Sequence, residues 1–172
     1  MNVTLATPVT LWNLIVVASG TFDDSTVFNC ADNLGNVYTP VTAGADAGTI
    51  VTGRAYVSRV TAGGSLTTVT FTANGGSSNV VGLAQIIEGP FAPTAVSQDA
   101  NPTDITNDTA TPFTCPATGT LAQAAEVVLC WMVGNGNVTL TATSPNLKSI
   151  QLNTATILTA VVGHQTVAAT TS

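Results

Sequence analysis

The stretch Thr67–Ala73 reads TTVTFTA, so Val69, Phe71 and Ala73 alternate with threonines. A period of two places successive side chains on opposite faces of a β-strand. One face of this strand is therefore expected to be buried and the other to contact water. Asn137–Thr143 repeats the pattern, with apolar side chains facing inward and polar ones facing outward.

Two other segments, Leu11–Ala18 and Glu126–Val133, are almost continuously apolar. Such runs suit strands that are covered on both faces or that lie at a subunit contact, so these two are predicted to be central strands. Further strands are expected at Val37–Thr42, Thr49–Val60, Asn79–Glu88, Leu147–Leu152 and Ala155–Val162. The turn signals that separate the strands are Asn33–Asn36, Ala62–Ser65, Asn74–Ser77, Gly134–Asn137 and Ser144–Asn146.

Many short strands at even spacing, with almost no helical pattern, predict an all-β fold, an antiparallel β-sandwich of Ig-like or jelly-roll type. A length of 172 residues indicates a single domain, residues 1–172, that is large enough to bury its own core. The region 89–117 breaks the rhythm because it carries most of the eight prolines. It is interpreted as a long contact loop, with a solvated crossover between sheets as the alternative.

Composition excludes several classes of function. Charged residues make up 7% of the chain, and three basic side chains and one histidine stand against nine acidic ones. An enzyme needs titratable groups that converge in a pocket, and a nucleic-acid-binding protein needs a basic face, so neither function is expected. The net charge of −6 disfavours a membrane partner, and the apolar runs are too short for a transmembrane helix. No basic region precedes Leu14–Ala18, so a signal peptide is not expected.

No cofactor or metal ion is expected either. Cys30, Cys115 and Cys130 lack the CxxC spacing of zinc sites. They are interpreted as small buried residues, with a disulfide between the last two as the alternative. Asp32–Asn36 reads DNLGN and resembles the start of a calcium loop. A hairpin turn between two strands is the favoured interpretation, because asparagine and glycine accept positive φ.

The remaining candidate side chains are interpreted as structural. His164 has no nucleophile motif or carboxylate near it in the sequence, so it is expected to be a surface or interface histidine rather than a catalytic base. Trp12 and Trp131 lie within apolar runs, which favours core packing over a platform for sugar stacking. Tyr38 and Tyr56 fall in expected strands and are candidates for exposure. No catalytic, cofactor-binding or metal-binding residue is assigned.

Five segments in succession carry a resemblance to a known module: Leu14–Ala18, Ala31–Thr39, Ala55–Val60, Leu66–Phe71 and Val81–Ile86. The second contains a D-x-x-G-N-x-Y-T turn, and a strand of alternating threonine and apolar residues then precedes a Val/Ala-rich strand. This succession resembles a β-sandwich module common in bacteriophage virion proteins and bacterial surface proteins, and it covers about residues 11–88 well. The resemblance implies a scaffold with a surface role and gives no binding partner.

This resemblance implies a bacteriophage virion structural protein, first of all a capsid decoration or cement protein that is made in the host cytoplasm and lies on the virion surface. Its partners would be the major capsid protein or other virion subunits. The positive mean hydropathy predicts apolar surface buried between copies, so a homo-oligomer is expected, with a trimer favoured. The alternative is a receptor- or carbohydrate-binding adhesion module of a tail fibre or cell surface. Met1–Thr10 is expected to add a strand to a sheet edge, in its own subunit or a neighbour's, and to contact a partner.

Overall fold

The computed structural model describes residues 1–21, 27–41, 52–65, 67–74, 80–89, 91, 126–135, 148–154 and 158–167. All regular structure in these residues is β-strand, and none of it is a helix that could cross a membrane. The strands are β1 (Asn2–Thr4), β2 (Leu14–Thr21), β3 (Val27–Asp32), β4 (Thr39–Pro40), β5 (Thr52–Arg59), β6 (Thr68–Asn74), β7 (Val80–Ile87), β8 (Glu126–Asn135), β9 (Lys148–Thr154) and β10 (Leu158–Val167). Their pairings are antiparallel, so the predicted all-β antiparallel sandwich is confirmed.

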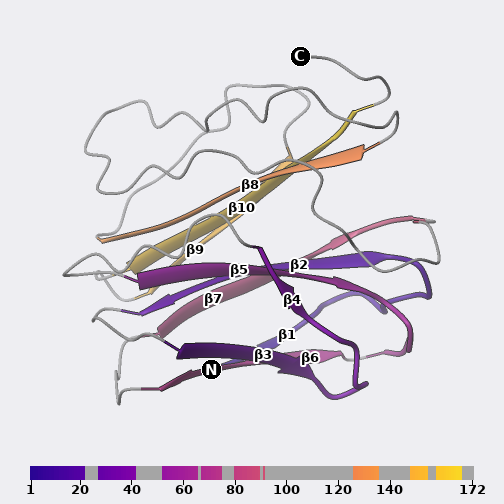
Figure 1. The fold of residues 1–172 in the computed structure, drawn as a ribbon, viewed down its shortest axis with the longest axis horizontal. Helices are drawn as coiled ribbons and strands as arrows, with labels where there is room; N and C mark the ends of the chain where they lie inside the picture. Colours follow the sequence, from indigo (N-terminus) through magenta and orange to yellow (C-terminus); the bar gives the residue numbers. More distant parts are fainter. Residues whose placement is uncertain are drawn as a thin grey trace.

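The described strands form sheets that lie in three layers (Figure 1). A four-stranded sheet in the order β4-β5-β2-β7 lies in the middle. The β1-β6-β3 sheet packs against one of its faces, and the β8-β10-β9 sheet packs against the other. An Ig-like or jelly-roll sandwich has two layers, so the third layer is a feature that the strand pattern did not predict.

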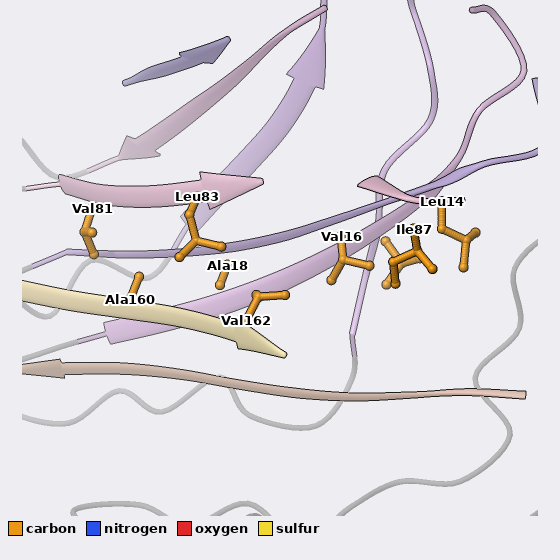
Figure 2. Packing of buried hydrophobic residues seen from close by; sticks show 9 residues of the cluster. Leu14, Val16, Ala18, Val81, Leu83, Ile87, Ala160 and Val162 are labelled. Atoms are coloured by element: carbon orange, nitrogen blue, oxygen red, sulfur yellow. The ribbon is translucent and has the colours of Figure 1, made fainter. Parts of the chain in front are cut away.

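Strand β2 is buried on both faces along its whole length. Figure 2 shows Val16 on the face that packs toward Val162 of β10. Ile15 and Val17 belong to the opposite cluster, together with Phe71 of β6. The predicted central strand is therefore confirmed for this segment. A sheet of the same chain covers each face of β2, so its apolar run requires no contact with another subunit.

Strand β8 was predicted to be central. Among the described strands it pairs only with β10, which is the central strand of this sheet. Trp131 and Val133 pack toward the core, while Val128 and Met132, which alternate with them, are half-buried on the other face. The apolar run of β8 is thus consistent with two partly covered faces.

Strand β6 has the alternation that the sequence predicted. Val69 and Phe71 are buried, and Thr70 and Thr72 are exposed. Its neighbour β3 was not predicted, whereas its neighbour β1 is the strand that Met1–Thr10 was expected to add to a sheet edge. The segment Met1–Thr10 supplies β1 and fills this sheet edge within its own chain.

Some predictions fall outside the described residues. These are the strand at Asn137–Thr143, the state of Cys115, and the Pro-rich region 89–117 apart from Gly89 and Phe91.

Two paired glycines let β8 approach the central sheet closely. Gly20 of β2 is the register partner of Gly53 of β5. A Cβ on Gly20 would clash with Cγ1 of Val133, and a Cβ on Gly53 would lie 3.1 Å from Cβ of the same valine. Because neither glycine has a side chain, Val133 packs directly against the backbone of this pair.

Gly20→Ala is expected to destabilise the protein by about 1–3 kcal/mol, as overpacking of a filled core does. Alanine in a strand otherwise gains roughly 0.5–1 kcal/mol over glycine, so the sign of the change tests the contact. Adding Val133→Ala should recover part of the loss, because it removes the methyl groups that collide. Urea denaturation of the single and double variants measures the coupling, and strictly additive losses would contradict the contact.

Candidate binding surface

One end of the central sheet carries two exposed large apolar side chains that are neighbours in the chain. Strand β2 begins there at Leu14, whose register partners are Arg59 of β5 and Ile87 of β7. The turn before β2 brings Leu11 and Trp12 to this end, where they are 50% and 38% exposed. Leu11, Trp12 and Arg59 are called the Trp12 surface below.

The backbone of Trp12 is held in an uncommon conformation. Its φ is 72°, in the left-handed region, where a bulky side chain costs of order 1–3 kcal/mol. Two long-range hydrogen bonds fix it there. The Trp12 N–H donates to the carbonyl of Val60 over 3.1 Å, and the Trp12 carbonyl accepts from the N–H of Phe91 over 3.0 Å. Strain of this kind gathers at functional sites, where the surrounding structure maintains it.

The guanidinium of Arg59 lies over the indole of Trp12, 5.0 Å from the ring centroid. This is a cation–π contact, which orients both side chains. Arg59 is half-buried, and its Nη1 is buried without a hydrogen-bond partner among the described residues. None of the carboxylates in the described part of the chain, Asp32, Glu88 and Glu126, forms an ion pair with it. The surface therefore presents an oriented, half-buried cation beside an aromatic ring.

A hydrogen-bonded turn centred on Asp32 follows β3. Oδ1 of Asp32 accepts from the backbone N–H groups of Leu34 (2.9 Å) and Asn36 (3.0 Å). Oδ2 accepts from Nδ2 of Asn36 (2.8 Å) and from the hydroxyl of Tyr38 (3.0 Å). Each carboxylate oxygen thus has two donors, as an anion that is satisfied by the protein itself requires.

Asn36 carries this network to the loop that follows β5. Its Oδ1 accepts from the backbone N–H groups of Thr61 (2.8 Å) and Ala62 (2.9 Å), and its Nδ2 donates to the Ala62 carbonyl over 3.1 Å. Arg59 stands two residues before Thr61, so the strand end that bears Arg59 is tied to the Asp32 turn. The Trp12 surface is preorganised for this reason.

The Asp32–Asn36 turn differs from both interpretations of its sequence. Its carboxylate serves the turn, which disfavours the calcium alternative. The turn is also not a hairpin, because it leads from β3 in an outer sheet to β4 in the central sheet. Among its residues only Gly35 has positive φ, at 78°. The strand expected at Val37–Thr42 is reduced to β4, since Val37 and Tyr38 belong to this crossover.

A groove with a volume of about 480 Å³ lies between β7 and β10. It is lined by Gln85, Ile86, Ile87, Glu88, His164 and Thr166. His164 was expected to be a surface or interface histidine, and the surface alternative is wrong, because His164 is only 7% exposed and lies on the central strand of its sheet. Within the described ranges, no three His, Cys, Asp or Glu side chains are grouped so that they could hold a metal ion.

The aromatic side chains divide differently from the sequence prediction. Trp131 packs against the core as predicted, whereas Trp12 lies at the surface. Tyr56 is buried and not exposed. Tyr38 is half-buried, and burial, followed by the charge and hydrogen bond of Asp32, raises the pKa of its hydroxyl.

The cysteines are not all unpaired. Cys130 takes part in a disulfide bond, which corrects the interpretation of three buried thiols. Cys30 is a free thiol. Burial, with a smaller contribution from the charge of Asp32, raises the pKa of Cys30 to about 12. This thiol is therefore neutral at physiological pH and a poor nucleophile or metal ligand.

Sequence reasoning missed Leu11 and Arg59 as surface residues. A usable signal was Asn13, which interrupts the apolar run and marks the true start of the strand one residue later. Comparison with known protein families, curated proteins and solved structures finds no match. The geometry of the Trp12 surface is therefore the main indication of function.

Proposed function

We propose that the protein is a structural protein of a bacteriophage virion, first of all a capsid decoration protein, and that it attaches to the particle through the Trp12 surface. The observation that carries this proposal is the exposed Trp12 on a strained, hydrogen-bonded backbone beside Leu11 and Arg59. Tryptophan and arginine are the residue types that dominate binding energy at protein interfaces. The partner is the major capsid protein or another virion subunit.

Two further features support a place on the particle exterior. The disulfide of Cys130 suits an oxidising medium, which a particle meets after it leaves the host cell. A rigid stack of sheets with few charged side chains also suits a scaffold. A homo-oligomer, with a trimer favoured, belongs to the same proposal. The half-buried outer face of β8, around Val128 and Met132, supports the oligomer. The apolar run of β2 does not, because both faces of β2 are covered within the chain.

A receptor- or carbohydrate-binding adhesion module is the second candidate. The exposure of Trp12 favours it, because an accessible indole is the platform on which a sugar ring stacks. Arg59 covers one face of that indole, which leaves less ring for a sugar. A protein partner therefore fits the surface better.

Trp12→Ala is expected to weaken binding to the particle by at least about 30-fold, the effect of losing an interface hot spot. The assay uses purified virions of the bacteriophage that encodes the protein. Immunogold labelling locates the protein on them, and rebinding of purified protein to particles stripped of it gives the affinity. Val37→Ala is the matched control, because this valine is 77% exposed on a different loop and should leave binding unchanged.

Loss of binding must come from the ring and not from the fold. Trp12→Gly relaxes the positive φ, so this variant should melt at or above the temperature of Trp12→Ala while binding equally poorly. Unlabelled virions, or equal rebinding by Trp12→Ala, would contradict the proposal. Binding of the parent chain to a glycan array, lost in Trp12→Ala, would favour the adhesion module instead.

A further inference from the structure

We propose that Arg59 and Trp12 form a receptor for the carboxylate side chain of a partner protein, an aspartate or a glutamate, and that an apolar side chain next to that carboxylate packs on Leu11 and the indole. This inference rests on the proposed function and deepens it. It specifies the chemistry that the partner presents to the Trp12 surface.

Arg59 selects the charge of the partner. It is one of three basic residues in a chain with nine acidic ones, yet it has no ion pair with a described carboxylate. Its Nη1 is buried and lacks a hydrogen-bond partner in the same part of the chain. The N–H donors of a guanidinium lie in its own plane, so they remain available when an aromatic ring lies beneath it. Because Nη1 is buried, a partner carboxylate would accept its two parallel hydrogen bonds from the Nε and Nη2 edge of the guanidinium, a pairing that no neutral group matches in strength.

Among the described side chains, Arg59 is the one cation of the Trp12 surface, which favours a carboxylate over a phosphate. Arg54 is on the same strand, five residues away, and adjacent positions of a strand alternate between faces. Tyr56 of β5 lies in one core cluster and Val57 in the other, so Arg54 and Arg59 belong to opposite faces of the sheet. A phosphate carries up to two charges and gathers several cations, whereas Arg59 alone balances one carboxylate.

The rest of the Trp12 surface supplies an apolar contact of fixed shape. Leu11 is 50% exposed beside the 38% exposed ring of Trp12. The backbone of Trp12 is held by the hydrogen bonds to Val60 and Phe91, and the backbone of Arg59 belongs to the β5 ladder. Little conformational entropy is lost on binding at such a surface, so a short segment of a partner can be recognised.

Solution NMR of protein labelled at arginine Nε and tryptophan Nε1 tests the proposal with two blocked dipeptides. N-acetyl-Leu-Glu-amide and N-acetyl-Leu-Gln-amide differ only in the carboxylate. The glutamate peptide is expected to shift the Arg59 and Trp12 signals saturably and to bind about tenfold more tightly than the glutamine peptide. Trp131 packs against the core and is the internal control, whose signal should not move.

Three variants assign the effect to the guanidinium. Arg59→Gln should abolish the preference for the glutamate peptide, and Arg59→Lys should retain only part of it, because an ammonium lacks the planar fork. Arg54→Gln removes the same charge from the opposite face of β5 and should keep the preference. Equal binding of both peptides by the parent protein, or a preference that survives Arg59→Gln, would overturn the proposal.

The peptide titration and the virion assay separate this inference from the proposed function. A carboxylate preference in a protein that does not bind virions would leave the receptor standing and remove the virion assignment. Virion binding that is lost in Trp12→Ala but kept in Arg59→Gln, without any peptide preference, would keep the virion assignment and remove the carboxylate receptor.

Discussion

Asp32→Ala is expected to lower the free energy of unfolding by roughly 3–4 kcal/mol, a large effect for a side chain in a turn. The substitution removes the acceptor of four hydrogen bonds at once, two of them from backbone N–H groups. It also releases Asn36, whose side chain holds the loop after β5. Urea denaturation measures the change as a lower midpoint with an unchanged slope.

A graded series separates the carboxylate from its single contacts. Tyr38→Phe removes one hydrogen bond and should cost about 1 kcal/mol. Asp32→Asn should fall between the two, because its carbonyl oxygen can still accept from Leu34 and Asn36 while its NH₂ group faces the donor Nδ2 of Asn36. A cost for Asp32→Ala no larger than that of Tyr38→Phe would show that water replaces the network.

The local sequence pattern was sufficient to predict a strand where the residue types follow the burial of each face. Thr68–Asn74 alternates because one of its faces is wet, and Leu14–Thr21 is apolar because both of its faces are covered. The pattern does not say what covers a face. A second subunit and a third sheet leave the same signature in β2, so the three-layer arrangement was not predictable. Strand β1 is three residues long, too short for any period to be read.

The Trp12 surface could not be predicted for a related reason. The apolar letters around Trp12 place it in a strand, but its φ is set by hydrogen bonds to Val60 and Phe91, which are distant in the sequence. His164 was misplaced because its burial depends on β10 being the central strand of its sheet, a property of the neighbouring strands. Both errors come from long-range structure that overrides a correct local pattern.

Deletion of residues 1–10 is expected to abolish cooperative folding or to lower the melting temperature by more than about 15 °C. Leu5 and Val9 are 5% and 2% exposed, and both pack in the cluster that includes Ile15 of β2. Removing two buried side chains costs about 5 kcal/mol, which is close to the whole stability of many domains. The sequence alone favoured a partner contact for Met1–Thr10, with the sandwich intact after its removal. The pairing of β1 with β6 confirms the alternative of a strand added within its own subunit, and the burial of Leu5 and Val9 opposes an intact sandwich after the deletion.

A shorter deletion separates the core side chains from the strand pairing. Removing residues 1–4 keeps Leu5 and Val9 but unpairs β6 from β1, so a cooperative transition should persist at a moderately lower temperature. The freed edge of β6 presents unpaired backbone groups, and such edges join to other chains. Light scattering should therefore detect association in this variant, whereas Leu5→Ala, which leaves the edge paired, should lose about 2–5 kcal/mol without associating. If deletion of residues 1–10 melted like the parent protein, neither the buried side chains nor the β1 pairing would contribute to the fold.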